Sequence, residues 1–185
     1  MKVIAGTARG MNLATPQGKH TRPTTGKIKE TLFNIIQADV PGSRFLDLYS
    51  GSGSIAVEAL SRGAKEAVFV DNNKEALACI NENIRKTRFG NQSQVMRTEV
   101  MHALKKLDNA GRVFDIIFMD PPYGRGFEKE ATRFLLNSHI VEKDTLIIIE
   151  TKKGEDISYI ESFPCSLEKV KEYKNNQHIF LRVKL

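Results

Sequence analysis

Short apolar segments alternate with longer amphipathic segments through the middle of the chain. The apolar runs with the length of buried strands lie near residues 44–48, 67–71, 93–97, 114–119 and 144–150. Helical spacing of apolar residues fills the intervals between them. Such alternation with short connections is typical of a parallel sheet covered by helices on both faces. The pattern therefore predicts an α/β fold.

The N-terminal residues depart from this alternation. Residues 2–6 and 10–14 predict a small hairpin, and a polar loop follows at residues 15–20. A helix is expected to begin near Thr24 or Thr25, because threonine is a suitable N-cap. The apolar stripe of this helix consists of Ile28, Leu32, Ile35 and Ile36.

The C-terminal residues also depart from it. Residues 167–173 and 178–184 predict a β-hairpin joined through residues 174–177. Added to the five predicted parallel strands, this hairpin completes a mostly parallel sheet of seven strands. A dinucleotide-binding fold usually ends on another crossover instead.

The most informative motif, Asp120-Pro121-Pro122-Tyr123, follows the apolar run that ends at Met119. Proline has no N–H and a fixed φ, so two prolines hold the turn stiffly and leave nearby acceptors free. Asp120 and the Pro121 carbonyl could therefore grip the hydrogens of an exocyclic amine and turn its lone pair outward. Tyr123 could stack on the base, a contact worth about 1–3 kcal/mol. The alternative is a strand followed by a Pro-Pro turn with a buried tyrosine.

A second motif, Gly51-x-Gly53, follows the predicted strand that contains Asp47. Glycines allow the backbone to approach a ligand, and free N–H groups at a helix start suit a carboxylate or phosphate. The next strand ends at Asp71, where an acid in a doubly wound fold holds ribose hydroxyls. With Asp120, these residues point to one crevice at the strand ends.

Two cofactors suit such a crevice. Gly51-x-Gly53-x-x-Ala56 also matches the dinucleotide fingerprint, which leaves a dehydrogenase open. Asp47, however, could take the amino group of a methionine moiety, and a dehydrogenase has no need of the motif at Asp120. S-adenosylmethionine explains both features, because its sulfonium carries a methyl group that the oriented amine can attack.

On these motifs the chain resembles the RsmD family of class I methyltransferases, which act on guanine N2 in 16S ribosomal RNA. The resemblance covers essentially the whole chain and includes IAGTARG at residues 4–10, RPTT at 22–25 and KETLFNII at 29–36. It implies a Rossmann-like fold with a mostly parallel seven-stranded sheet, helices on both faces, a C-terminal antiparallel hairpin and a small N-terminal hairpin extension. The N-terminal segments narrow the choice, because the motif at Asp120 alone fits many amino-methyltransferases.

The resemblance also implies the site residues. The expected catalytic residues are Asp120, Pro121, Pro122 and Tyr123. The residues expected to bind S-adenosyl-L-methionine are Thr24, Asp47, Tyr49, Ser50, Gly51, Gly53, Asp71, Asn72 and Glu99. Glu99 takes the place near the adenine at which related enzymes more usually have aspartate. The expected RNA contacts are Arg9, Lys19, Arg22 and Lys27.

Composition agrees with one globular unit. The chain has 185 residues, of which 41% are hydrophobic. We expect a single methyltransferase domain at 1–185, with a basic extension and helix at 1–43 and a catalytic core at 44–185. The apolar stretch at the start is too short for a signal peptide, and no apolar run approaches the roughly 18 residues that a membrane span needs. The protein is therefore expected in the cytoplasm. The two cysteines and four histidines lack the spacing of a disulfide framework or metal site, and no metal is expected.

Charge indicates the partner. The formal net charge is +6, and residues 1–44 contribute +5 of it with seven basic and two acidic side chains. Such a patch attracts a polyanion and makes binding salt dependent, although it could equally be a solvated face. We expect 16S ribosomal RNA as the partner, within the 30S subunit or a late assembly intermediate.

Two other functions stay open. An adenine-N6 methyltransferase acting on DNA or RNA would share the cofactor residues and the motif at Asp120. A non-catalytic RNA-binding protein could keep the same fold.

Overall fold

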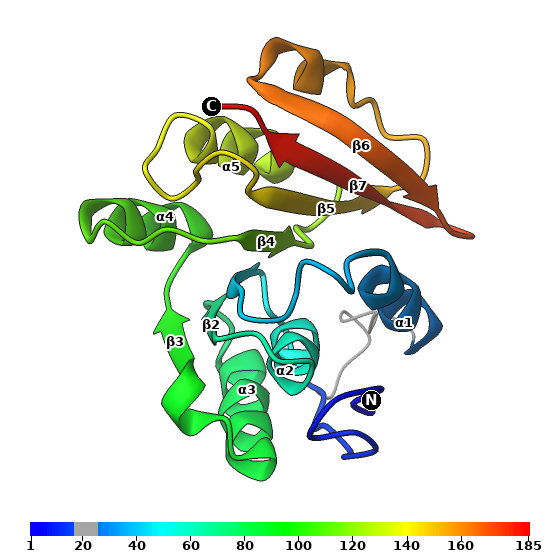
Figure 1. Ribbon diagram of the computed structural model, residues 1–185, viewed down its shortest axis with the longest axis vertical. Coiled ribbons are helices and arrows are strands. Elements are labelled where there is room, and N and C mark those ends of the chain that lie inside the picture. Colours follow the sequence, from blue (N-terminus) through cyan, green and yellow to red (C-terminus); the bar gives the residue numbers. More distant parts are fainter. Residues whose placement is uncertain (17–25) are drawn as a thin grey trace.

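Seven strands form one sheet in the computed structural model, which describes residues 1–16 and 26–185 (Figure 1). They are β1 (Arg44–Leu48), β2 (Glu66–Asp71), β3 (Ser93–Arg97), β4 (Ile116–Met119), β5 (Leu146–Lys152), β6 (Cys165–Glu172) and β7 (Asn176–Val183). Their order is β3-β2-β1-β4-β5-β7-β6. The first five strands are parallel, and β7 runs antiparallel between β5 and β6. This topology confirms the predicted fold class.

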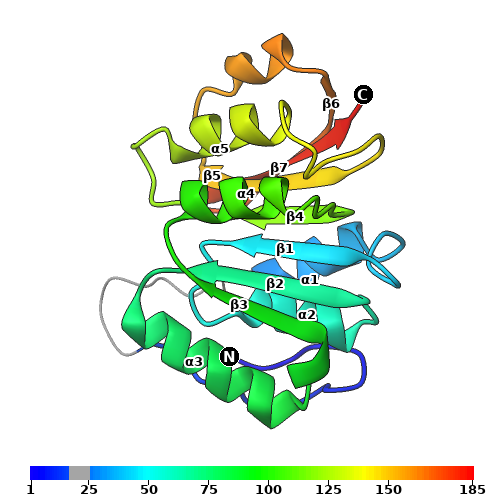
Figure 2. The ribbon, with the colours of Figure 1, turned by 90° about the vertical axis from the view of Figure 1, so that its left-hand side faces the viewer.

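Helices cover both faces of the sheet. They are α1 (Gly26–Ile35), α2 (Ser54–Ser61), α3 (Lys74–Thr87), α4 (Val100–Asn109) and α5 (Phe127–Leu135), with short 3₁₀ turns η1 (Gly90–Gln92) and η2 (Ser158–Ser162). The side chains of α1, α2 and α3 belong to the core on one face, and those of α4 and α5 to the core on the other. Figure 2 shows α4 and α5 in front of the strands and α1 and α2 behind them.

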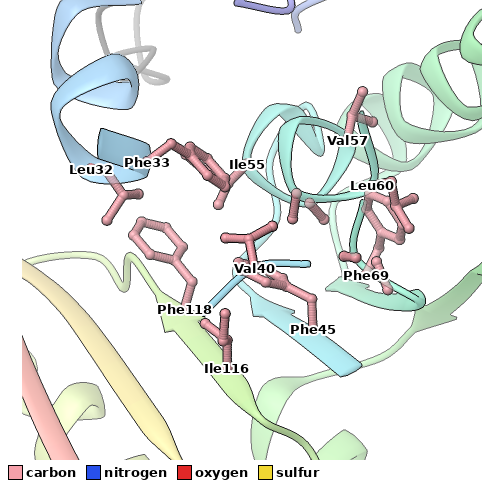
Figure 3. Close-up of a cluster of buried hydrophobic side chains, with 14 of the residues drawn as sticks. Leu32, Phe33, Val40, Phe45, Ile55, Val57, Leu60, Phe69, Ile116 and Phe118 are labelled. Carbon is pink, nitrogen blue, oxygen red and sulfur yellow. The ribbon is translucent and has the colours of Figure 1, made fainter. Parts of the chain in front are cut away.

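Aromatic side chains fill the core beneath α1 and α2. Phe33 of α1 and Ile55 of α2 lie over Phe118 of the sheet, and Leu60 of α2 lies beside Phe69, with Phe45 in the same cluster (Figure 3). All but Ile55 are no more than 2% exposed. Because both faces are covered, the central strands are apolar runs rather than alternating ones, which is why the sequence pattern located them.

A buried glutamate anchors the N-terminal segment to α2. The carboxylate of Glu58 accepts hydrogen bonds from the backbone N–H groups of Ile4 at 2.9 Å and Ala5 at 3.0 Å. Its oxygens also lie 3.1 Å from Nζ of Lys29 and 2.9 Å from Nε of Arg62. Lys29 and Glu58 are both completely buried.

This anchor changes the predicted N-terminal hairpin. Among the described residues of this segment, only one isolated antiparallel bridge forms, between Lys2 and Asn12. The amides of Ile4 and Ala5 bind Glu58 instead of extending the ladder. The predicted hairpin is therefore present in a shorter form, in which Val3 donates its N–H to the carbonyl of Met11 at 3.0 Å and Leu13 donates to that of Met1 at 2.8 Å, while residues 4–6 leave the pairing.

Close packing at Gly6 fixes the same segment. Gly6 has a φ of +79°, and a Cβ atom there would stand 1.7 Å from the carbonyl oxygen of Ser61. The next residue, Thr7, donates its N–H to that oxygen at 2.8 Å. The segment thus needs glycine for both its conformation and its contact with the end of α2.

The observed bounds of several strands differ from the predicted ones by a few residues. β5 begins two residues later than predicted, because Asp144 lies in a turn with a φ of 68°. Asn176 and Gln177, predicted in a connection, are buried residues of β7. The predicted helix start at Thr24 or Thr25 lies outside the described residues. Within the described ranges, no helix is long and apolar enough to cross a membrane.

The Lys29–Glu58 pair yields a stability prediction. Replacing Lys29 with alanine leaves the buried carboxylate of Glu58 without its ion pair to Lys29. The free energy of unfolding, measured by urea denaturation, should therefore fall by about 3 kcal/mol. The control is Lys86→Ala, which breaks the exposed pair with Glu82 and should lower the free energy of unfolding much less. Equal losses in the two variants would contradict the anchoring role.

Candidate active site

The parallel strands bring acidic residues to one edge of the sheet. In the β1 register, Leu48 pairs with Val70 of β2 and with Met119 of β4. Met119 in turn pairs with Ile149 of β5. The acids at or next to the carboxyl ends of these strands therefore share the carboxyl edge. They are Asp47, Asp71, Asp120 and Glu150.

The glycine-rich turn after β1 is held by Ser50. The Ser50 hydroxyl donates to the carbonyl of Asp47 at 2.7 Å and accepts from the N–H of Val70 at 3.0 Å. The backbone carbonyl of Ser50 accepts a hydrogen bond from the N–H of Gly53 at 2.7 Å. The described contacts of the Ser50 hydroxyl are thus internal and bind the turn to β2.

The two glycines of the turn have different surroundings. Gly53 has a φ of +73°, and a Cβ atom there would come within 3.0 Å of the Phe69 ring, so packing requires this glycine. Gly51 has a φ of +56°, and a Cβ atom there would have nothing within 4 Å. Its N–H donates to Asp71 at 2.8 Å. The open space at Gly51 is where a ligand can approach the backbone.

Asp47 is a buried carboxyl group with weak internal compensation. It is 1% exposed, and its Oδ2 accepts a long hydrogen bond of 3.3 Å from the N–H of Ala56. Burial, together with a smaller contribution from the nearby charge of Asp71, raises the pKa of Asp47 to about 8. A ligand cation would stabilise the ionised form, as the ammonium group of a methionine moiety does.

The ends of β2 and β3 carry a second polar group. Asp71 accepts from the N–H of Asn73 at 2.8 Å as well as from Gly51. The Asn72 amide donates to Oε1 of Glu99, which lies at the start of α4. Asn72 and Glu99 are exposed. The structure therefore places the residues predicted for the ribose and the adenine side by side.

The Asp-Pro-Pro-Tyr motif leaves the sheet directly after β4. Asp120 is partly exposed, and burial of its carboxyl group raises its pKa well above the ordinary value, with further contributions from Glu150 and Asp47. The Tyr123 ring is 45% exposed, and its hydroxyl lies 3.4 Å from Oε1 of Glu150. The alternative of a buried tyrosine is therefore wrong. An acceptor and an accessible aromatic ring stand together at this edge.

Sequence reasoning missed Glu150 and its partners. Glu150 accepts from His178 at 2.9 Å and from the Asn176 amide, both on β7. The available signal was that residues 146–150 form another apolar run ending in an acid, as at Asp71 and Asp120. An aromatic contact was missed as well: Tyr49, with a φ of 63°, stacks on Phe127 with ring centroids 6.5 Å apart.

The predicted RNA contacts are more dispersed. Arg9 is exposed and lies near the end of α2 that is farther from the glycine-rich turn, since the adjacent Ala8 contacts Ser61. Lys27 is exposed at the start of α1. Lys19, Arg22 and Thr24 lie outside the described residues.

Part of the basic excess in the N-terminal quarter is internal. Lys29 is buried against Glu58, and Arg44 pairs with Asp115 at 2.7 Å and Glu142 at 2.6 Å. Neither side chain is free to contribute its full charge to a surface patch. Within residues 1–16 and 26–185, no group of three or more His, Cys, Asp or Glu is placed to hold a metal ion.

Comparison with known proteins assigns the chain to a family. A family model described as Conserved hypothetical protein 95 matches residues 1–183. Proteins named Ribosomal RNA small subunit methyltransferase D are similar over most of their length. The Buchnera aphidicola protein is 34% identical over 84% of this chain and 80% of its own, and the Haemophilus influenzae protein is 31% identical over 91% and 88%. The chain belongs to the RsmD methyltransferase family.

Solved structures agree with this assignment. The Escherichia coli protein yhhF has a TM-score of 0.85 and 25% identity, with 100% of this chain and 98% of that chain covered. A structure solved in complex with SAH has a TM-score of 0.70 over 83% of this chain and 48% of that chain. At 16% identity this second likeness shows the fold alone. The expected resemblance to the RsmD family is thereby confirmed.

Asp47 yields a prediction about pH and ligand binding. Its raised pKa means that the folded protein keeps a proton which the unfolded chain loses above about pH 4, so this group's contribution to stability falls as pH rises toward about 8. Asp47→Asn should therefore be more stable than the wild type at pH 9 by at least about 1 kcal/mol, with little difference at pH 4. The same variant should bind S-adenosylhomocysteine about tenfold more weakly, because the ligand's ammonium loses its partner.

Thermal unfolding at both pH values and calorimetry with S-adenosylhomocysteine would measure these effects. Asp115→Asn is the matched control, because Arg44 lowers the pKa of Asp115 and the variant should lose stability at pH 9. A loss of stability at pH 9 in Asp47→Asn would mean that Asp47 is a structural residue.

Proposed function

We propose that this RsmD-family methyltransferase transfers a methyl group to the exocyclic N2 amine of one guanine in 16S ribosomal RNA. The methyl donor is S-adenosyl-L-methionine. Similar proteins named Ribosomal RNA small subunit methyltransferase D support ribosomal RNA as the substrate. The 30S subunit or a late assembly intermediate would present the guanine, which would place the protein in the cytoplasm.

One observation supports an amine as the methyl acceptor. Asp120 stands at the end of β4 between two other acids, Asp47 and Glu150, and its burial together with their charges raises its pKa. The exposed ring of Tyr123 lies on the same loop. A carboxyl acceptor beside an accessible aromatic ring suits a flipped base that carries an NH₂ group.

The residues of the edge divide into a cofactor set and a base set. Asp47, the Gly51 backbone, Asp71, Asn72 and Glu99 would hold the cofactor along the ends of the first three strands. Tyr49, Ser50 and Gly53 would shape the turn that supports them, and Thr24 keeps its predicted role. When bound, S-adenosylmethionine supplies an electrophilic methyl group on a positively charged sulfur.

The residues of the loop would act on the base. An amine nitrogen of guanine donates its lone pair into the ring and is a poor nucleophile until acceptors turn that pair outward. The Asp120 carboxylate and the Pro121 carbonyl would accept its two hydrogens, Pro122 would stiffen the turn, and Tyr123 would stack on the base. The nitrogen gains the methyl group and loses a proton, and a carboxyl group of raised pKa is suited to take that proton. Alignment and the exclusion of water would supply much of the rate.

A specific alternative shares this geometry. Adenine N6 is also an exocyclic amine, so the site residues would serve an adenine methyltransferase equally well. The names of the similar proteins favour ribosomal RNA over DNA. A non-catalytic RNA-binding role is disfavoured by the raised pKa of Asp120, which has a cost that simple binding does not require.

Methyl transfer to defined substrates tests the proposal. Labelled S-adenosylmethionine would be incubated with undermethylated 30S subunits, naked 16S RNA or duplex DNA, and the nucleosides then separated. N2-methylguanosine from the RNA is expected, whereas N6-methyladenine would overturn the choice of base. Absence of transfer to every substrate would overturn the enzymatic proposal.

The same assay tests the role of Asp120. Asp120→Asn keeps the shape of the side chain but removes a proton acceptor, so kcat should fall about 100-fold or more. Binding of S-adenosylhomocysteine should stay within about threefold of the wild type, because the cofactor set is intact. Full turnover in Asp120→Asn would contradict the acceptor role.

A further inference from the structure

A buried polar network lies behind the exposed ring of Tyr123. At its centre is Glu150, which ends the apolar part of β5 and is 4% exposed. One carboxylate oxygen lies 2.9 Å from Nε2 of His178. The other accepts from the side-chain amide of Asn176 and lies 3.4 Å from the Tyr123 hydroxyl. Strands β5 and β7 and the loop after β4 thus meet at one carboxylate.

The histidine of this network is held in one orientation. His178 is completely buried, and its ring packs edge to face against Phe118, Tyr173 and Phe180. Its Nδ1 lies 3.2 Å from the Tyr173 hydroxyl. A hydroxyl that donates to Nδ1 leaves Nε2–H to donate to Glu150, which makes every contact of the ring complementary.

Burying this carboxylate has a cost that the fold alone does not require. Well-packed apolar residues would serve a strand end at least as well as a buried polar network. Glu150 is also placed where its charge acts on the site, because Met119 pairs with Ile149 and the two next residues are Asp120 and Glu150. After burial, the charge of Glu150 makes the largest contribution to the raised pKa of Asp120.

We propose that Glu150, held by His178 and Asn176, is a positioning residue of the methyl-transfer site: it tethers the Tyr123 hydroxyl and presents its negative charge to Asp120. This role rests on the proposed function. It concerns residues of β5 and β7 that belong neither to the expected cofactor set nor to the Asp-Pro-Pro-Tyr motif.

The tether and the charge have separate consequences. The tether connects an exposed ring to a rigid buried group, so the ring would be ordered before the base arrives. The charge matters during transfer, when the nitrogen–carbon bond forms, the carbon–sulfur bond breaks and positive charge moves from sulfur to nitrogen. A second carboxylate behind Asp120 stabilises that charge and strengthens the hold of Asp120 on the departing proton.

Other ionisable groups lie around Asp120 and the Glu150 network and must be kept constant in the test. They are Asp47 on β1, Lys152 on β5, Glu155 after β5, His178 on β7, Tyr173 after β6 and Glu128 on α5. Substitutions at Glu150 and Tyr123 leave these six in place.

Glu150→Gln removes the charge and keeps the shape. Its carbonyl oxygen can still accept from Asn176 and Tyr123, and its amide can donate to His178 after a change of tautomer. We expect kcat to fall about tenfold. The acid limb of the kcat profile, where Asp120 becomes protonated, should shift to lower pH, since loss of the Glu150 charge lowers the pKa of Asp120. Glu150→Asp, which restores the charge, should return the limb toward its wild-type position.

Tyr123→Phe removes the tether and keeps the ring. Loss of one hydrogen bond should raise the KM for RNA by roughly threefold to tenfold, with the acid limb unmoved. This variant changes an exposed residue and should fold normally, so it tests the tether even if Glu150→Gln is unstable. Glu168→Gln is the control, because Glu168 forms an exposed pair with Arg182 elsewhere in the same hairpin and should leave kcat, KM and the pH profile unchanged.

The outcomes separate the two proposals. Transfer by the wild type, with an unmoved acid limb in Glu150→Gln and an unchanged KM in Tyr123→Phe, would overturn the role of Glu150 and leave the proposed function intact. A shifted limb together with a raised KM supports both parts of the role. A wild type that transfers no methyl group to any RNA would overturn the proposed function and this role with it.

Discussion

The burial of neighbouring carboxyl groups at one edge of the sheet is the constraint on which the site depends. Asp47, Asp120 and Glu150 end or nearly end β1, β4 and β5, three adjacent strands. Parallel pairing forces these strand ends to the same edge, and the pKa values of Asp47 and Asp120 are raised by burial and by their acidic neighbours. A site of this kind favours cationic ligands. S-adenosylmethionine carries an ammonium and a sulfonium group, and these positive charges complement the acidic groups of the edge.

The rest of the chain supports that edge. Ser50 binds the glycine-rich turn to β2, and Gly53 lets the turn pack against Phe69. Farther along α2, the Glu58 anchor joins the N-terminal segment and α1 to this helix. The helix whose start carries the glycine turn is therefore fixed at its other end, which limits how far the turn can move. Different carboxylates thus form the proposed site and stabilise the fold: Asp47, Asp120 and Glu150 lie at the edge, and Glu58 forms the anchor.

Much of the fold, and the position of several acids at one edge of the sheet, was predictable because both depend on local patterns. Apolar runs located the strands, and an acid at the end of a run marked Asp71 and Asp120. The partners of Glu58 and Glu150 were not predictable in this way. The Glu58 anchor joins residues 54 positions apart, and the Glu150–His178 pair depends on the exact antiparallel register of β5 and β7. Charge counting also overestimated the basic surface, because a sum over the sequence cannot know that Lys29 and Arg44 have internal partners.

The most direct test of this account is the number of protons released when the cofactor binds. Calorimetry at pH 7 in buffers of different ionisation enthalpy would measure it for S-adenosylmethionine and for S-adenosylhomocysteine, which lacks the sulfonium charge. The account predicts proton release with both ligands, because their ammonium group favours ionised Asp47, and a larger release with S-adenosylmethionine. Binding of both ligands without proton release would contradict the claim that buried carboxyl groups form this site for a cation.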